Sequence, residues 1–289
     1  MRRRCAALVA AAALACAAPA GASDGAAPAG ADAWVSRIAD SLRIAHTMSA
    51  HAHVDVDNPG RNQDFAFDMH MLRDREGGTL RTVIELREKG DTRSIVNELI
   101  EKPGEPLTSW YWDLQKRRWV SVRGVLATDA FADTLFRYED LWLVEPTPRR
   151  KGRSAWVEHG GRRFVEIESE PYHYYQRVVT RIDPESGLPT SVRFIDTTGT
   201  PIREQRYEQV TLVDGLPFPT VVRLRDLVAG GETTVTYGDV RFGRRIPPSF
   251  FDLSVIDDRI RRGVDPVPDP PDLPDLADRP RVAPPAAAP

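Results

Sequence analysis

Hydrophobic and polar residues alternate with a period of two through most of residues 49–242. Such alternation is typical of β-strands that bury one face and expose the other. Turn sequences such as Asp214-Gly215 and Gly230-Gly231 separate the alternating runs. We therefore predict strands over residues 49–57, 64–73, 79–88, 94–101, 107–114, 118–125, 155–159, 163–169, 174–183, 188–196, 201–212, 218–227 and 232–242.

This pattern favours a mainly β fold with a few helices. The arrangement that we expect is a single curled antiparallel sheet, an incomplete half-barrel covered by short helices. Two packed sheets would produce a similar pattern and stay open as the alternative.

The alternation stops at residues 131–145, whose sequence is FADTLFRYEDLWLVE. Here large apolar residues recur at spacings of three and four, which places them along one side of a helix or of a pair of helical turns. Those residues are Phe131, Leu135, Tyr138, Leu141 and Trp142. We expect a short helical plug that lies against one face of the sheet, because a solvent-facing loop rarely carries so many large apolar groups. A surface loop is the alternative.

Two further segments flank the strands. Residues 32–46 carry apolar residues at helical spacing and predict a helix that docks on the sheet. Residues 246–256 (IPPSFFDLSVI) indicate a closing turn that returns Phe250, Phe251 and Leu253 to the core.

The N-terminus combines a basic start at Arg2, an alanine-rich apolar run and a small-residue cleavage site at residues 20–22. These three parts are typical of a secretory signal peptide, so we expect the chain to be exported. The segment ending at Cys16 resembles a lipobox, and a lipid anchor there is the less favoured alternative. The predicted organisation is a signal peptide over 1–22, a flexible leader over 23–31, one half-barrel domain over 32–258 and a proline-rich disordered tail over 259–289.

Composition and motifs narrow the function. The formal net charge of −3 gives no reason to expect a nucleic-acid partner. Both cysteines lie inside the predicted signal peptide, which leaves no cysteine nucleophile or thiolate metal site in the mature chain. No serine-hydrolase elbow, phosphate-binding loop or zinc-protease motif is present, so we expect no catalytic residue and no cofactor. His51 and His53 share a strand face, which we interpret as solvated rather than metal-binding.

One strand face gathers large and flexible apolar residues. Methionine suits a surface that must adapt to ligands of varied shape. If the helices fill the curled sheet only in part, these residues line an apolar cavity, whereas a fully packed core would use the same residues. The candidates for lipid binding are Phe65, Phe67, Met69, Met71, Trp110, Trp112, Leu141 and Trp142.

The segment FRYEDL at residues 136–141 precedes an ordered series of strand and turn motifs. These are Ile182-Asp183, Leu188-Pro189, residues 196–199 and the proline-bounded turn at 246–251. The ordered set resembles the LolA-like outer-membrane lipoprotein-sorting protein family, best after Trp110. This resemblance implies a half-open β-barrel with helices as a lid, which carries acyl chains through the periplasm. It also implies a link to lipid transporters of the resistance-nodulation-division type, and it identifies no catalytic residue.

We therefore expect a monomeric, non-enzymatic periplasmic carrier or chaperone for lipids or acylated lipoproteins. Its partners would be acyl chains together with an inner-membrane transporter or an outer-membrane acceptor. The alternative is a sensor or interaction module of the same fold that binds a membrane protein.

Overall fold

The computed structural model describes residues 33, 47–74, 79–87, 93–102, 108–113, 116–123, 126, 128–138, 153–169 and 175–262. The described residues form one thirteen-stranded sheet in the order β6-β5-β4-β3-β2-β1-β13-β12-β11-β10-β9-β8-β7. Its strands are β1 (Thr47–Asn58), β2 (Arg61–Arg73), β3 (Leu80–Arg87), β4 (Arg93–Glu101), β5 (Thr108–Asp113), β6 (Arg118–Val122), β7 (Arg153–His159), β8 (Arg162–Ser169), β9 (Arg177–Ile182), β10 (Pro189–Ile195), β11 (Pro201–Val213), β12 (Leu216–Asp226) and β13 (Glu232–Phe242). Each predicted strand is therefore present, within a few residues of its expected bounds.

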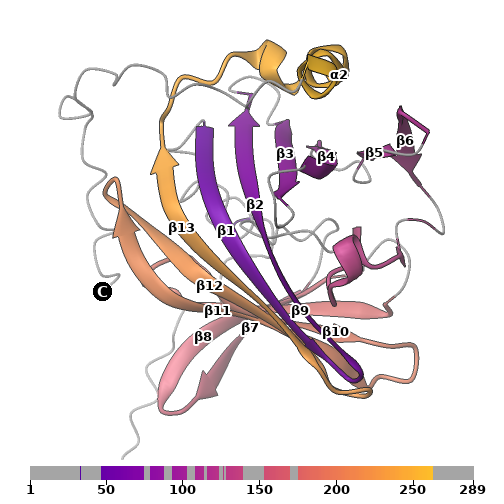
Figure 1. The fold of residues 1–289 in the computed structure, drawn as a ribbon. Helices are drawn as coiled ribbons and strands as arrows, with labels where there is room; N and C mark the ends of the chain where they lie inside the picture. The colour runs from indigo at the N-terminus through magenta and orange to yellow at the C-terminus, as the bar shows by residue number, and fades with distance from the viewer. Residues whose placement is uncertain are drawn as a thin grey trace, which may run out of the picture.

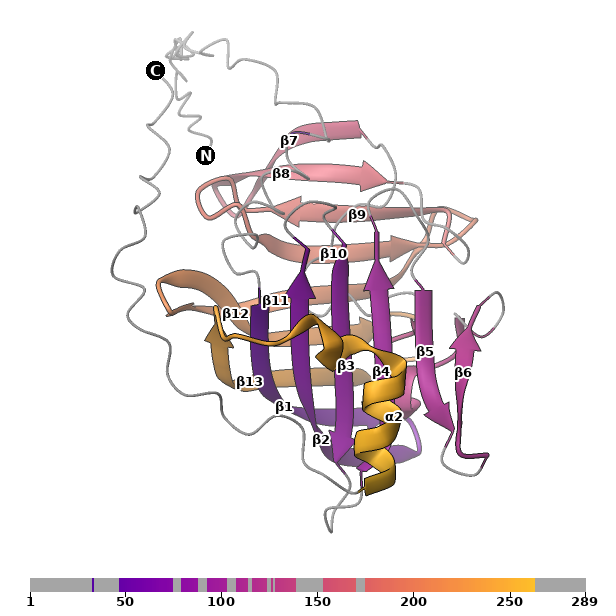
Figure 2. The same cartoon turned by 90° about the horizontal axis from the view of Figure 1, so that it is seen from above.

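The sheet is antiparallel throughout and is not closed into a barrel. Its centre is the pairing of the first strand with the last, in which Val54 lies opposite Val235. Strand twist accumulates over the many strands of the sheet. Figures 1 and 2 show that the sheet curls until β1–β5 run across the direction of β8–β10. The prediction of a single curled antiparallel sheet, an incomplete half-barrel, is confirmed.

Strand alternation separates an inner face, which bears the main hydrophobic cluster, from an outer face. In β1 the buried side chains of Val54 and Val56 point inward, while His51, His53 and Asp55 are exposed. The inner cluster draws on both halves of the chain, including Phe67, Met69, Ile84, Val192, Phe194, Tyr207, Phe218, Leu224, Val235 and Tyr237.

The plug lies against the inner face as expected, but its described part is not a helix. Residues Phe131–Asp133 form a single 3-10 turn, η2, in which Ala132 and Asp133 have φ angles of +46° and +58°. Two consecutive left-handed residues end any right-handed helix, so the helical prediction is wrong for residues 131–138. The turn is closed by Thr134, whose Oγ1 donates to the Phe131 carbonyl at 2.6 Å, and by the Phe131 amide, which donates to the Phe136 carbonyl at 2.7 Å. Leu141 and Trp142 lie outside the described residues.

The last described residues of the chain lie on the outer face of the sheet. The expected closing turn is η4 (Pro248–Phe251), and it leads into an α-helix, α2 (Leu253–Arg262), that was not expected. Phe250 and Phe251 are buried as predicted, in a second hydrophobic cluster with Val83 and Trp112 that is separate from the inner cluster. Leu253 is only partly buried. Figure 2 shows α2 lying across β3 and β4.

The predicted helix over 32–46 and the proline-rich tail fall outside the described residues, apart from Ala33 and the residues up to Arg262. Within the described part of the chain, no helix has the length and apolar character needed to cross a membrane.

Candidate functional site

The inner face is the candidate ligand site, because it combines large area with apolar character. Phe67 and Met69 of β2 are each 1 % exposed, and Phe65 packs against the same cluster with part of its ring accessible. The Phe67 ring meets Tyr237 edge-on at 6.4 Å between centroids, and Tyr237 meets Phe218 at 5.5 Å. Aromatic side chains from β2, β12 and β13 thus interlock on the inner face.

The sequence-based candidates lie on both faces of the sheet. Phe65, Phe67, Met69 and Met71 point inward, but Trp110 and Trp112 point outward. The register explains why: Met69 pairs with Ile84, Ile84 with Asn97, and Asn97 with Tyr111. Directly opposed residues share a face, so Tyr111 faces inward and its two tryptophan neighbours face outward.

Tyr111 is an inner-face residue that sequence reasoning missed. Its ring stacks on Tyr138 at 6.4 Å, and Tyr138 meets Phe131 edge-on at 5.6 Å, so the two tyrosines connect β5 to the plug. Burial raises the pKa of Tyr138 to about 12, which keeps its hydroxyl neutral at any physiological pH. Alternation along β5 could show that Tyr111 faces the opposite way from Trp110 and Trp112. Deciding which of the two faces is the inner one required the register across three strand pairs.

Side chains from three strands hold the plug by its backbone. Gln63 of β2 donates to the Ala132 carbonyl at 3.1 Å, and Arg203 of β11 donates to the Leu135 carbonyl at 2.8 Å. The Leu135 amide donates in turn to Oγ1 of Thr233 in β13 at 3.0 Å. These bonds satisfy backbone groups that would otherwise lack partners beside an apolar surface. They leave Phe131 and Phe136 free to insert into the inner cluster.

The polar groups buried on the inner face are neutral. The amide of Gln205, which is fully buried, donates to the Tyr207 hydroxyl at 2.7 Å. Burial raises the pKa of Tyr207 and Tyr237 above the usual value for tyrosine. Both carboxylates that are buried among the described residues, Glu85 and Glu98, lie on the outer face. Apart from the half-buried Arg203, which binds the plug, the inner face can therefore accept an apolar chain without burying a charge beside it.

The outer face beneath α2 differs from the inner face, because ionisable groups surround its apolar residues. We call the cluster of Val83, Trp112, Ile246, Phe250, Phe251 and Ile256 the helix-covered patch. Ionisable groups surround it: Arg259 of α2 reaches Glu85 at 2.8 Å, and Arg81 lies 3.5 Å from Asp252. Burial raises the pKa of Glu98 to about 7, with Arg81 opposing that rise and Asp252 adding to it. This patch holds the C-terminal helix to the sheet.

Burial also perturbs a histidine in the helix-covered patch. The pKa of His70 falls to about 4 because the ring is desolvated, while the nearby Asp68 carboxylate acts in the opposite direction. Arg259 and Arg244 lower it further. The ring meets Phe250 edge-on at 5.0 Å, and its Nδ1 lies 3.2 Å from the Ser49 hydroxyl. His70 is therefore neutral at physiological pH.

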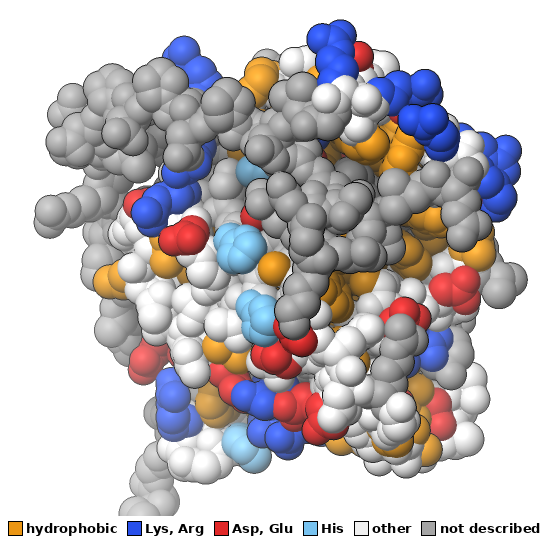
Figure 3. Space-filling view, in the orientation of Figure 1, with side chains coloured by type: hydrophobic (Ala, Val, Ile, Leu, Met, Phe, Trp, Pro, Cys, Tyr) orange, Lys and Arg blue, Asp and Glu red, His pale blue; other side chains and the backbone are white. Residues whose placement is uncertain are grey.

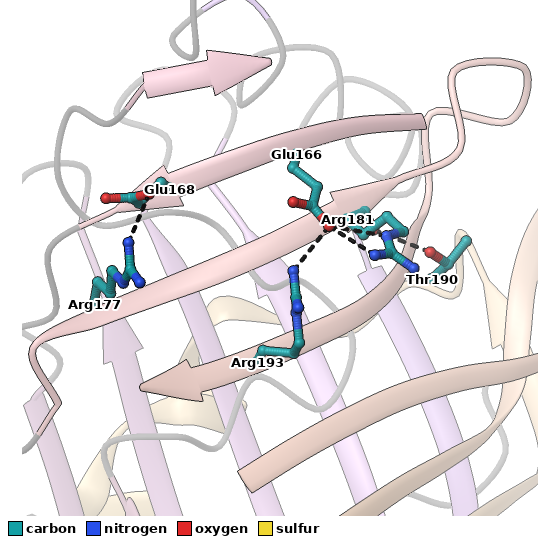
Figure 4. Close-up of polar contacts among 6 residues, drawn as sticks. All are labelled: Glu166, Glu168, Arg177, Arg181, Thr190 and Arg193. Atoms are coloured by element: carbon teal, nitrogen blue, oxygen red, sulfur yellow. Dashed lines mark hydrogen bonds and ion pairs between the residues drawn. The ribbon is translucent and has the colours of Figure 1, made fainter. Parts of the chain in front are cut away.

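On the outer face of β8–β10, charged side chains form cross-strand pairs (Figure 4). Oε1 of Glu166 accepts from Arg181 at 2.8 Å and from Arg193 at 3.0 Å, while Glu168 lies 3.3 Å from Arg177. Each carboxylate is thus paired with arginines of β9 or β10, which is a structural role rather than the arrangement of an acid and a base.

His51 and His53 lie on the solvated outer face, as expected. Figure 3 shows histidine side chains over β1 with carboxylates beside them. His51 lies 2.9 Å from Asp68 and His53 lies 3.2 Å from Asp55, and both rings are about half exposed. Among the described residues, no group of three or more His, Cys, Asp or Glu side chains is placed to hold a metal ion. The absence of a metal site stays a prediction.

A family model described only as "Uncharacterized protein" matches residues 81–258, which is more than half of the chain. A search of the curated proteins found no match.

Solved structures share the fold. A DUF1329 family protein from Desulfovibrio piger superposes with a TM-score of 0.69 at 13 % identity, over 78 % of this chain and 98 % of that one. A putative outer membrane lipoprotein-sorting protein domain from Vibrio parahaemolyticus gives 0.67 at 15 % identity, over 78 % and 99 % of the two chains. A LolA superfamily protein from Nitrosomonas europaea gives 0.55 at 13 % identity, over 78 % and 99 %. At such low identity these likenesses show a LolA-like fold and nothing further, and the resemblance seen in the sequence is confirmed at that level.

Proposed function

The chain belongs to the family of uncharacterized proteins whose model covers residues 81–258, and we propose that it is a periplasmic binding protein for lipids or for the acyl chains of lipoproteins. The observation that carries the proposal is the inner face: a curled open sheet with large, flexible apolar side chains, neutral polar groups and no buried carboxylate among the described residues. Neighbours of the same fold that are titled as lipoprotein-sorting proteins are consistent with it.

The proposed mechanism is passive and needs no catalytic residue. Each methylene of an acyl chain gains about 0.8 kcal/mol when it leaves water for an apolar surface. Met69 and Met71 can change rotamer to fit chains of different shape, whereas Phe67 and Phe65 give a stable floor. The carrier would then release its cargo to an acceptor toward the outer membrane, with a transporter of the resistance-nodulation-division type as the donor implied by the sequence resemblance.

Loading requires space, because the inner residues are closely packed in this conformation. Phe67 and Met69 are almost fully buried, and Phe131 and Phe136 of the plug fill part of the inner face. We infer that a bound chain takes up volume that these side chains occupy when no ligand is present. Leu141 and Trp142 remain predicted contributors.

The same close packing favours the second candidate function, a non-enzymatic interaction module. In that case the inner face is simply a core, and the protein acts through its surface on a membrane-protein partner. The two functions differ in a measurable way, because a carrier binds acyl chains and a module with a filled core does not.

The deciding experiment is titration of the purified protein with a fluorescent fatty acid, accompanied by mass spectrometry of co-purified lipid. Phe67→Asp places a charge on the inner face and should weaken probe binding by at least tenfold. The matched control is Ala66→Asp on the same strand, because Ala66 pairs with His53 on the outer face. Circular dichroism checks folding in both variants. If the natural protein binds no probe and carries no lipid, the carrier function is excluded and the interaction module takes its place.

A further inference from the structure

The β11–β12 hairpin exposes apolar side chains at its tip. Leu212 is 76 % exposed and Val210 is 52 % exposed. They lie on the same face of β11, opposite Pro217 and Pro219 of β12. Figure 1 shows the tip of this hairpin at the end of two interior strands of the sheet. Side chains of this kind in contact with water are unfavourable unless they serve a contact.

The hairpin tip is continuous with the inner face. Val213 and Leu216, the residues that flank its turn, pack against the inner cluster. Next to them, Phe218 meets Phe242 edge-on at 5.7 Å. The turn of the hairpin therefore touches the candidate ligand site, while Val210 and Leu212, at the alternate positions of β11, point to the opposite face.

A basic segment is fixed beside this tip. The Phe242 amide donates to Oδ2 of Asp214 in the hairpin turn at 2.8 Å, which joins the end of β13 to the turn. Arg241 and Arg245 are exposed, Arg244 is half-buried, and no carboxylate occurs between Asp239 and Asp252. Basic side chains are visible at this edge in Figure 3. Exposed apolar residues next to arginines are the combination that binds an anionic lipid surface.

We propose that the tip of the β11–β12 hairpin and the arginines that follow β13 dock the protein on an anionic lipid bilayer. Val210 and Leu212 enter the boundary between headgroups and acyl chains, while Arg241 and Arg245 contact the acidic headgroups. This inference rests on the proposed function, because docking at this tip would place a membrane next to one end of the inner face. It adds the partner surface, which the ligand site alone does not specify.

The chain offers a matched control in the β12–β13 turn. Val228 is 72 % exposed, nearly as much as Leu212, but it follows the opposite end of β12. An eleven-residue strand separates the two positions by roughly 35 Å. The carboxylate of Asp226 accepts from the Val228 and Ala229 amides, so the turn carries a fixed negative charge. The neighbouring Arg225 is paired with Glu232, so the exposed Val228 lies beside a charge pair and not beside a run of arginines.

The test is co-sedimentation of the mature protein with vesicles of phosphatidylcholine, with and without phosphatidylglycerol. The protein is exported from a precursor that carries Cys16→Ser, so that no acyl anchor can form. We expect binding to the anionic vesicles only, a loss on the order of tenfold in V210S/L212S, and no change in V228S. R241Q/R245Q should lose about fivefold or more and should remove the salt dependence.

Three results would overturn the docking surface: no binding to anionic vesicles, equal binding to neutral vesicles, or undiminished binding in V210S/L212S. If the hairpin binds a protein partner instead of a membrane, the first result, no binding to anionic vesicles, is expected. Fatty-acid probe binding without vesicles is measured on the same variants as an independent readout. If the probe still binds while vesicle docking fails, only this inference is lost, and if the probe does not bind at all, the proposed carrier function is lost.

Discussion

The two faces of the sheet bury hydrophobic side chains in different surroundings. On the inner face, Phe67, Phe218 and Tyr237 pack among apolar neighbours and neutral hydroxyl and amide groups. On the outer face, the helix-covered patch packs beside Glu85, Glu98, His70 and Arg259. The inner face suits ligands that vary in shape and carry no charge. The outer patch suits one helix in one position, because a buried ion pair tolerates little displacement.

The largest expected effect comes from Phe136→Ala on the inner face. Phe136 is 1 % exposed and anchors the plug in the inner cluster. Removing the ring should lower the free energy of unfolding by about 3–5 kcal/mol through lost burial and an unfilled cavity. Denaturant titration measures this free energy, provided that its dependence on denaturant concentration has the same slope in both proteins. A midpoint equal to that of the natural protein would mean that the plug does not belong to the core.

On the outer face, Arg259→Met should lower the free energy of unfolding by a somewhat smaller amount, about 3 kcal/mol. Glu85 is 2 % exposed and Arg259 is 14 % exposed, so the substitution leaves a buried carboxylate without its arginine while keeping apolar volume over Phe250.

The control for that variant is Arg262→Met in the same helix. The Arg262 side chain is 68 % exposed and pairs with Asp258 four residues earlier, an arrangement worth only a few tenths of a kcal/mol. Hydrogen exchange should show loss of protection concentrated in α2 for Arg259→Met alone. Equal behaviour of the two variants would show that the Glu85 pair does not hold the helix.

Glu98→Gln should change how stability depends on pH. Because burial raises the pKa of Glu98 to about 7 from 4.5, the folded protein binds more protons than the unfolded chain between these values. The stability that Glu98 contributes is present below pH 4.5 and is lost as pH rises through 7, an effect on the order of 2–3 kcal/mol. Glutamine removes this loss, so E98Q should be the more stable protein at pH 8. An identical pH profile in both proteins would refute the assignment.

His70→Asn should change the dependence of stability on pH in the opposite direction to Glu98→Gln. Burial lowers the pKa of His70 from 6.5 to about 4, so the folded protein binds fewer protons than the unfolded chain in that range. Its contribution is present above pH 6.5 and is lost as pH falls through 4, by about 1–2 kcal/mol after allowance for partial solvent contact. Thermal melts between pH 4 and 7 should show H70N losing less stability on acidification than the natural protein. A steeper loss in H70N would contradict this sign.

The smallest effect is expected on the solvated outer face of β1. The double variant His51→Ala, His53→Ala removes two half-exposed rings and should change the free energy of unfolding by no more than about 0.5 kcal/mol. Metal analysis after dialysis should give the same low zinc content for both proteins. Stoichiometric zinc that is retained by the natural protein and lost in the variant would show that this face binds metal.

The strands could be predicted from sequence because the alternation of hydrophobic and polar residues lies within each strand. Alternation identifies which residues share a face, and Val54 and Val56 against His51 and His53 show how clean that signal is. The inward group Phe65, Phe67, Met69 and Met71 was identified correctly as one face for this reason. Which face of one strand joins which face of the next depends on register, and register is set by contacts far apart in sequence. Trp110 and Trp112 were therefore grouped with residues that point the other way.

The sequence by itself determined the thirteen strands and their turns, since a period of two and turn residues such as Gly231 are local properties, and it favoured a single antiparallel sheet without excluding two packed sheets. Only the tertiary structure decided the rest. The plug became an irregular turn because Gln63, Thr233 and Arg203 bind its backbone from three separate strands. Residues 253–262 became a helix because a short segment gains most of its helical stability from packing, here on Trp112 and Glu85. Where long-range contacts choose between local conformations of similar free energy, no single stretch of sequence carries the answer.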